Sequence, residues 1–150
     1  MIFKGCTTWF IKQDGSFVPG PELPKSLENI DRHSVTKINA TTSIIIGGAL
    51  GNTESIITYY FNHPEQVWNK GPNLNIGRIH HVSGLVTDKK TNKKFLVVIG
   101  GENQALGPLD STEILRDNKW IKGIHIPSCC KIIYFKLTIF EATFRLHFTT

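Results

Sequence analysis

The amino-acid sequence predicts an all-β chain of small antiparallel sheets that repeat about every 50 residues. Three observations predict this fold class. Apolar stretches of about four to eight residues alternate with turn-rich linkers, and the chain holds 13 Gly and 7 Pro. Residues 1–127 contain no ten-residue span with helical periodicity. The third observation is a set of sequence landmarks that occurs twice in the same order.

The landmarks are a tryptophan, a Gly-Pro-x-Leu sequence, an arginine with a nearby histidine, and an apolar stretch that ends in Gly-Gly. Gly48 and Gly101 are 53 residues apart, and Trp68 and Trp120 are 52 apart. The two Gly-Pro-x-Leu sequences begin 51 residues apart. A third repeat begins at "KWIKGIHIP" and is not completed.

The first repeat opens with "WFIKQDGSFVPGPELP", where the tryptophan precedes the Gly-Pro-x-Leu sequence. The linker "ELPKSLENIDRHS" has room for at most one short helical turn. The strands that follow are expected at "SIIIGG", "TYYFN" and "QVWNKG", because β-branched and aromatic residues dominate them.

The second repeat predicts strands at "HHVSGLV", "KFLVVIGG", "STEIL" and "KWIKG". A dense basic cluster lies between the first two of these strands. With a net charge of +5 and a pI near 9.2, the chain invites a nucleic-acid interpretation. We favour a solvated hairpin tip over a phosphate-binding patch, because lysines prefer solvent. The cluster consists of Lys89, Lys90, Lys93 and Lys94.

The order of these strands resembles the kelch repeat, with Arg and His in the first strand, Gly-Gly at the end of the second and Trp in the fourth. The stretch "GGENQALGPLDSTEILRDNKW" fits the kelch pattern closely. In the preceding repeat the third strand carries Tyr59, Tyr60 and Phe61 instead of a Glu-like position. The resemblance covers residues 1–127 and implies kelch-type β-propeller blades, each a four-stranded antiparallel sheet. About two and a half repeats cannot close a ring of four to eight blades, so the propeller is incomplete.

The resemblance implies structural roles for the residues that define the repeat. A side chain at either Gly-Gly would meet a neighbouring strand or require an unfavourable φ. The tryptophans are expected to pack between blades. Arg32 and Arg78 are expected at the start of the innermost strand, where they bind loop carbonyls or a partner's carboxylate, and we favour the structural use. The repeat-defining residues are Gly47, Gly48, Trp68, Arg78, Gly100, Gly101, Glu113 and Trp120.

The sequence predicts no catalytic, cofactor-binding or metal-binding residue. A phosphate loop is disfavoured because "GGENQALG" lacks a Gly-Lys-Ser/Thr ending and no helix follows "GGALGN". His80 and His81 are adjacent on a predicted strand, so their side chains point to opposite faces. No Cys/His spacing suits zinc, and no Ser-His-Asp or Cys-His set is present.

The repeat landmarks stop after Pro127. We therefore divide the chain into a repeat region, residues 1–127, and a divergent hydrophobic tail, residues 128–150. The three cysteines, Cys6, Cys129 and Cys130, make a poor disulfide framework and indicate a reducing compartment. The sequence shows no signal peptide and no apolar stretch of membrane-spanning length, so a cytoplasmic location is the default expectation.

The predicted function is a protein–protein interaction module, or a fragment of one, that binds through its inter-strand loops. These loops are "ALGNTES", "FNHPEQ", "TDKKTNK" and "ENQALGPLDS". We expect a protein partner, no nucleic acid, no membrane, no cofactor and no enzymatic activity, and self-association through exposed blade faces. Two alternatives are a non-functional truncated product and a fragment of a kelch-propeller enzyme resembling galactose oxidase. The copper chemistry of that enzyme needs two Tyr, two His and a Cys, and this set is missing here.

Overall fold

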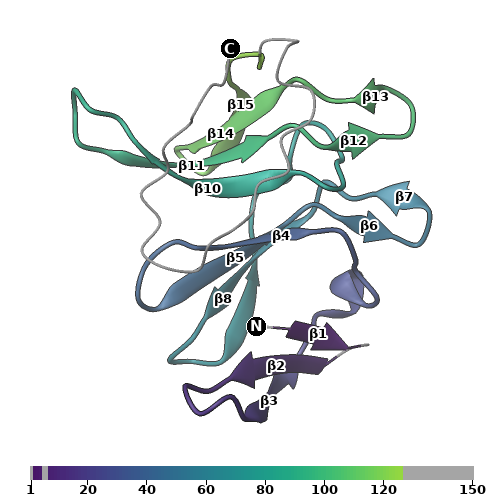
Figure 1. The fold of residues 1–150 in the computed structure, drawn as a ribbon, viewed down its shortest axis with the longest axis vertical. Helices are drawn as coiled ribbons and strands as arrows, with labels where there is room; N and C mark the ends of the chain where they lie inside the picture. The colour runs from purple at the N-terminus through teal and green to yellow at the C-terminus, as the bar shows by residue number, and fades with distance from the viewer. Residues whose placement is uncertain (1, 5–6, 127–150) are drawn as a thin grey trace.

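The fold was examined in a computed structural model, which describes residues 2–4 and 7–126. The described residues form one three-stranded and two blade-like four-stranded sheets in a row, with two small two-stranded sheets beside them, and all of these sheets are antiparallel (Figure 1). The prediction of an all-β chain with four-stranded antiparallel sheets is confirmed. The described residues form no helix with the length and apolar character that a transmembrane span requires.

The first four-stranded sheet, here called blade 1, has the strand order β4-β5-β8-β9. β5 is its most buried strand, and Ile44, Ile45 and Ile46 are all fully buried there. Such a run buries both faces of a strand, as expected when one sheet has a neighbour on each side. The strands are β4 (Ser34–Lys37), β5 (Thr42–Ile46), β8 (Thr58–Asn62) and β9 (Val67–Lys70).

The second four-stranded sheet, blade 2, has the equivalent order β10-β11-β14-β15. Its first hairpin is longer than that of blade 1, and the predicted lysine cluster occupies its exposed tip. Asp88 holds this tip by accepting hydrogen bonds from the Lys90 backbone N–H (2.9 Å) and the Thr91 hydroxyl (2.7 Å). The strands are β10 (Val82–Thr87), β11 (Lys94–Ile99), β14 (Thr112–Arg116) and β15 (Lys119–Lys122).

In both blades a small hairpin joins the second strand to the third. In blade 1 the hairpin is β6 (Ala49–Leu50) with β7 (Thr53–Glu54), and in blade 2 it is β12 (Glu102–Asn103) with β13 (Gly107–Pro108). Figure 1 shows the two hairpins projecting on the same side of the molecule, one beside the other.

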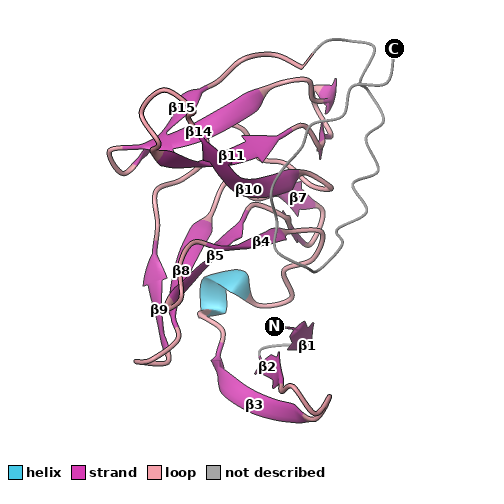
Figure 2. Cartoon of the chain, turned by 60° about the vertical axis from the view of Figure 1, so that its left-hand side comes forward, coloured by secondary structure: helices cyan, strands magenta, loops and turns pink. Residues whose placement is uncertain are grey.

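The N-terminal sheet has three strands in the order β1-β2-β3, which are β1 (Ile2–Lys4), β2 (Thr7–Ile11) and β3 (Phe17–Glu22). The only helical turn of the described residues, η1 (Lys25–Leu27), lies between this sheet and blade 1 (Figure 2). This agrees with the single short helical turn expected for that linker.

The glycine pairs occupy the same place in both blades and adopt the left-handed backbone conformation. The second glycine of each pair has φ near +95°, at Gly48 (φ 95) and Gly101 (φ 93). A Cβ atom on Gly48 would lie 2.5 Å from the Asp31 carbonyl oxygen, and one on Gly101 would lie 2.5 Å from that of Ile79. Both conformation and space therefore require glycine at these positions.

These contacts correct the predicted equivalence of the two arginines. Isolated bridges pair Asp31 with Ala49 and Ile79 with Glu102, so Arg32 corresponds to His80. Both of these residues have positive φ, 50° and 54° respectively. The position of Arg78 is taken by Ile30 in blade 1. The cause is the spacing between arginine and histidine: Arg32 is one residue before His33, whereas Arg78 is three residues before the equivalent His81.

The tryptophan of the first landmark also differs from the prediction. Trp9 lies on β2, whereas Trp68 and Trp120 lie on the outermost strands β9 and β15. On β3, which is the equivalent outer strand, Phe17 precedes the Gly-Pro-x-Leu sequence at the spacing that Trp68 has in blade 1.

Two hydrophobic clusters lie on the two faces of blade 1. One lies between the blades and consists of Ile44, Ile46, Leu74, Leu96, Val98 and Trp120. The other lies on the opposite face of blade 1, against the linker that contains η1, and consists of Leu23, Leu27, Ile30 and Ile45. Blade 1 is thus packed on both faces.

The predicted boundary between the repeat region and the tail, the tail itself, and all three cysteines lie outside the described residues.

Candidate functional site: a groove between two hairpins

A groove of about 520 Å³ lies between the hairpins β6–β7 and β12–β13. Its walls come from both blades, so neither blade forms it alone. It is lined by Arg32, Ala49, Asn52, Thr53, Glu54, Ile79, Glu102, Asn103, Gln104, Gly107 and Pro108. Most of these residues are polar or charged.

Hydrogen bonds between the blades hold the two hairpins in position. The Glu54 carboxylate accepts a hydrogen bond from the Gln104 backbone N–H (2.9 Å), which links β7 directly to the second hairpin. The Asn103 side chain donates to the Gly77 carbonyl oxygen (2.8 Å) and accepts from the backbone N–H groups of Ala105 and Leu106. The groove is therefore built on a hydrogen-bonded frame.

Charged groups of both signs stand at the groove. The Arg32 side chain is 39% exposed and donates to the Asp31 carboxylate at 3.0 Å. The His80 Nδ1 atom lies 4.0 Å from the Glu102 carboxylate, and both of these side chains are more than half exposed. Because these pairs are solvated, they contribute little to folding and remain available to a ligand.

Arg78 precedes the groove residue Ile79 in the chain and is fully buried. Its guanidinium donates to the carbonyl oxygens of Gly100 (2.7 Å) and Ser111 (3.2 Å), and to the Glu113 carboxylate (3.0 Å). Glu113 also accepts from the Asn75 backbone and side chain and from the Ile76 backbone. The pair joins the linker between the blades to β14. Its role is structural, because no atom of the arginine side chain is exposed.

The same positions in blade 1 carry no charge. Ile30 stands in the place of Arg78, and Tyr59 in that of Glu113, since Thr58 and Thr112 are equivalent. Ile30 packs in the hydrophobic cluster beside Tyr59, whose hydroxyl lies 2.9 Å from the Ser26 hydroxyl on η1. Both members of the buried ion pair are thus replaced together, which leaves no buried charge unpaired.

The two adjacent histidines do not converge on a common site. His80 is exposed beside Glu102, whereas His81 is buried and its Nε2 atom lies 2.8 Å from the Ser34 hydroxyl of blade 1. Burial, with the nearby positive charge of Arg78, lowers the pKa of His81 from 6.5 to about 4, so its ring is neutral near pH 7. Within residues 2–4 and 7–126, no three His, Cys, Asp or Glu side chains form a metal-binding group.

The two tryptophans predicted to lie between blades occupy different surroundings. Trp120 is buried between the blades, and its indole N–H donates to the Pro72 carbonyl oxygen at 3.0 Å. Trp68 is half-buried, and the centroid of its ring lies 4.6 Å from that of the Phe61 ring. Neither residue lines the groove. None of the eight repeat-defining residues lines the groove.

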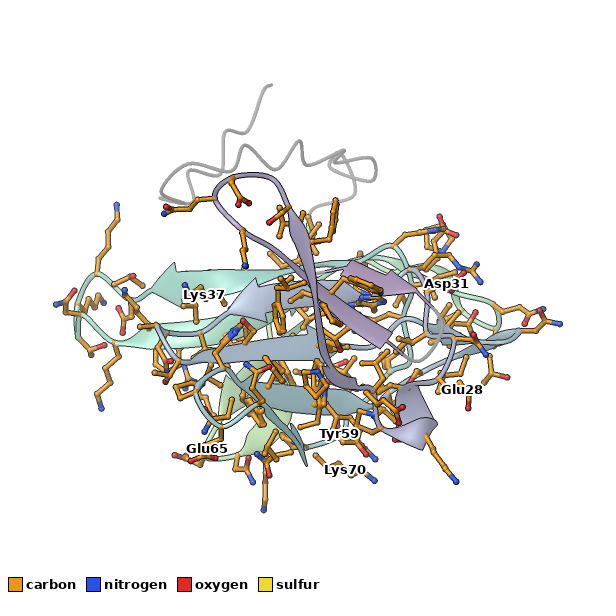
Figure 3. The ribbon with its side chains drawn as sticks, turned by 90° about the horizontal axis from the view of Figure 1, so that it is seen from below. Glu28, Asp31, Lys37, Tyr59, Glu65 and Lys70 are labelled. Carbon is orange, nitrogen blue, oxygen red and sulfur yellow. The ribbon has the colours of Figure 1, made fainter. Side chains whose placement is uncertain are left out.

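The four loops predicted to carry specificity do not lie on one surface. The loops "ALGNTES" and "ENQALGPLDS" form the groove hairpins. The loops "FNHPEQ" and "TDKKTNK" are turns at the opposite ends of their strands. Figure 3 shows this separation in blade 1, where Lys37 and Glu65 lie at one end and Asp31 and Glu28 at the other.

Sequence reasoning missed Arg32 as a groove residue distinct from Arg78, and it gave His80 only as half of an adjacent pair. Both residues have positive φ and stand in the chain between the two residues that approach Gly48 or Gly101, an arrangement that no spacing in the sequence displays. A comparison of blade positions instead of landmarks could have found the equivalence.

No protein-family model matches the chain, and no curated protein sequence matches it. Among solved structures it is similar to YjhT, a kelch-type β-propeller protein, with a TM-score of 0.63 and 12% sequence identity. The similarity covers 83% of this chain and 46% of the YjhT chain, so the chain spans a little under half the length of that structure. At this identity the likeness concerns the fold alone, and the chain has the fold of β-propeller blades.

Proposed function

We propose that the chain is part of a kelch-type propeller and acts as a protein-interaction module whose binding site is the hairpin groove. Two features support kelch-type repeats. The Gly-Gly pairs occupy equivalent places in both blades, and a tryptophan lies on each outermost strand. The fold likeness to YjhT is in keeping with both features.

The observation that carries the binding proposal is the composition of the groove. Arg32, Asn52, Thr53 and Gln104 present exposed or partly exposed polar groups on a frame that other hydrogen bonds already hold. Exposed polar loops on a rigid scaffold are where proteins most often place recognition. The carboxylates of Glu54 and Glu102 disfavour a phosphate backbone, so a protein segment fits the groove better than nucleic acid.

A charge exchange in the groove tests this proposal. The double variant Arg32→Glu with Glu102→Lys leaves the net charge unchanged and reverses the charge pattern of the groove. The matched control is Lys37→Glu with Glu65→Lys, which makes the same exchange at the opposite end of blade 1 (Figure 3). We expect proteins captured from a cell extract by the unmodified chain to be retained by the control and lost by the groove variant.

Equal capture by all three proteins would contradict a binding role for the groove, and loss only with the control would move the site to the turn end. Thermal melts of both variants establish that folding is unchanged, because all four side chains are exposed.

A further inference from the structure

The turn between β4 and β5 carries an asparagine that is followed two positions later by a hydroxyl residue. Its tripeptide Asn39-Ala40-Thr41 has the pattern Asn-x-Ser/Thr, in which the asparagine accepts an N-linked glycan, and the sequence contains this pattern once. Because three residues match by chance often, the surroundings of Asn39 decide whether it is a modification site. All three residues of the tripeptide are exposed.

Hydrogen bonds within the turn fix the side chain of Asn39. Its Oδ1 atom accepts from the Thr41 backbone N–H at 2.9 Å and from the Thr41 hydroxyl at 3.0 Å, which closes an Asx turn. Both bonds end on the oxygen, and no hydrogen bond joins the amide nitrogen, Nδ2, to another described residue. The nitrogen is therefore held at the surface with both of its N–H groups available.

The backbone of the turn is anchored to blade 1. The Ile38 N–H donates to the Thr42 carbonyl oxygen at 2.9 Å, which closes the hairpin. The His63 N–H, from the turn that follows β8, donates to the Thr41 carbonyl oxygen at 2.8 Å. These bonds use only main-chain atoms on the side of the turn, so a group attached to Nδ2 of Asn39 disturbs none of them.

The position of the turn keeps it away from the groove. Lys37, the last residue of β4, lies at one end of blade 1, and Asp31 lies at the other, where the groove hairpins begin (Figure 3). Asn39 follows Lys37 by two residues and belongs to the same end. A large group on Asn39 would therefore leave the groove open to a ligand.

Asn103, in the second groove hairpin, makes the same kind of turn but uses its nitrogen differently. Its Oδ1 atom accepts from the backbone N–H groups of Ala105 and Leu106, whereas its Nδ2 atom donates to the Gly77 carbonyl oxygen at 2.8 Å. The side chain is also half-buried. The chain thus holds one Asx turn whose amide nitrogen is available and one whose amide nitrogen is occupied.

We propose that Asn39 is a glycosylation site, whose Nδ2 atom receives an oligosaccharide from a lipid-linked oligosaccharyl diphosphate. In this transfer Nδ2 forms a bond to the anomeric carbon of the sugar. The bond from that carbon to the diphosphate oxygen breaks, the electron pair leaves on the diphosphate, and one amide proton passes to a base of the transferring enzyme. Such glycans are bulky and hydrophilic, and they need a surface position of this kind. In cells this transfer takes place in the secretory pathway, so the proposal replaces the default expectation of a cytoplasmic location.

The test is to incubate the folded full chain with a purified oligosaccharyltransferase and a lipid-linked oligosaccharide, and to measure the intact mass. We expect one glycan on each chain and none on the Asn39→Gln variant. Thr41→Ser keeps the hydroxyl of the pattern and should be modified, whereas Thr41→Val keeps the shape without the hydroxyl and should not. A folded chain left unmodified would overturn the proposal. Modification of a free peptide of residues 37–43 in the same reaction shows that the enzyme is active.

A matched control separates the geometry of the turn from the three-residue pattern. Ala105→Thr, made in the Asn39→Gln variant, creates the same pattern at Asn103, and residue 105 is exposed. We expect transfer to Asn103 to be at least about tenfold slower than transfer to Asn39, because its bond to the Gly77 carbonyl must open first. Equal rates at the two asparagines would overturn the role given to the available nitrogen of Asn39.

Discussion

At the scale of single residues, the buried pair Arg78–Glu113 shows how one fold uses different chemistry at equivalent positions. In blade 2 an ion pair with six further hydrogen bonds holds the linker between the blades. In blade 1 Ile30 and Tyr59 hold the preceding linker, which contains η1, by apolar packing. A buried charge without its partner is far more costly than either arrangement, which explains why both positions differ together.

A double-mutant cycle on this pair is the first prediction. Arg78→Met leaves the Glu113 carboxylate buried without its cation, and Glu113→Gln leaves the guanidinium without its anion. We expect each change to lower the free energy of unfolding by about 3–5 kcal/mol. The double variant contains neither charge, so its loss should be smaller than the sum of the two by about 2 kcal/mol or more. Urea unfolding measures all four proteins.

Additive losses in that cycle would show that the two side chains act independently and would contradict the structural role of the pair. Burial lowers the pKa of Arg78, but the guanidinium stays charged at any pH used for unfolding. The cycle therefore compares charged with uncharged side chains throughout.

At the scale of elements, the two innermost strands meet through side chains. The Ser34 hydroxyl on β4 lies 2.8 Å from His81 Nε2, and the Thr36 hydroxyl lies 2.6 Å from that of Ser83 on β10. These contacts bind the blades at their inner edge, whereas the apolar cluster binds them across their faces. Protonation of His81 would disturb the inner edge first.

The stability of this edge should depend on pH. The folded pKa of His81, about 4, lies below its ordinary value of 6.5, so the unfolded chain binds the proton first as the pH falls. The contribution of the neutral ring is complete above pH 6.5 and is lost between pH 6.5 and 4. The size of this loss is about 3 kcal/mol.

The measurement is urea unfolding at several pH values between 7 and 4, with His81→Gln as the matched variant. The stability advantage of the unmodified chain should shrink by about 3 kcal/mol over this range. An advantage that is the same at every pH would contradict a buried neutral His81. His33, whose pKa burial also lowers, is present in both proteins and cancels in the comparison.

The strands themselves were predictable because their apolar stretches are short and bounded by Gly, Pro and Asn. The Gly-Gly pairs marked the same place in both blades, and Trp68 and Trp120 fell on equivalent outer strands. The equivalence of Arg32 with Arg78 was wrong because Arg32 is one residue before its histidine, whereas Arg78 is three residues before the equivalent one. A landmark of two residue types is a weak guide where the spacing between them differs.

The candidate groove was predictable only in part. Both of its hairpins were named as specificity loops, but two turns at the other end of the strands were named with them. The groove exists because Glu54 and Gln104, which are 50 positions apart, meet across the blade boundary. Such a contact depends on how the sheets pack, and a linear pattern does not display it.

At the scale of the whole molecule, the three sheets form one packed row in which each interface repeats the previous one. Trp120 donates to Pro72 across one interface, and Phe10 stacks on Phe61 across the other. The groove lies at one end of the strands, and the two outer faces lie at the ends of the row.

Hydrogen exchange at two equivalent amides tests the central claim most directly, which is that blades 1 and 2 have one plan and fold as one packed unit. Ile45 and Val98 occupy equivalent places on β5 and β11, and both are fully buried. We predict slow exchange at both amides, with opening free energies that agree within about 1 kcal/mol, because the cluster between the blades joins β5 and β11 so that the two strands open as a unit. Slow exchange at Ile45 with fast exchange at Val98 would contradict the account.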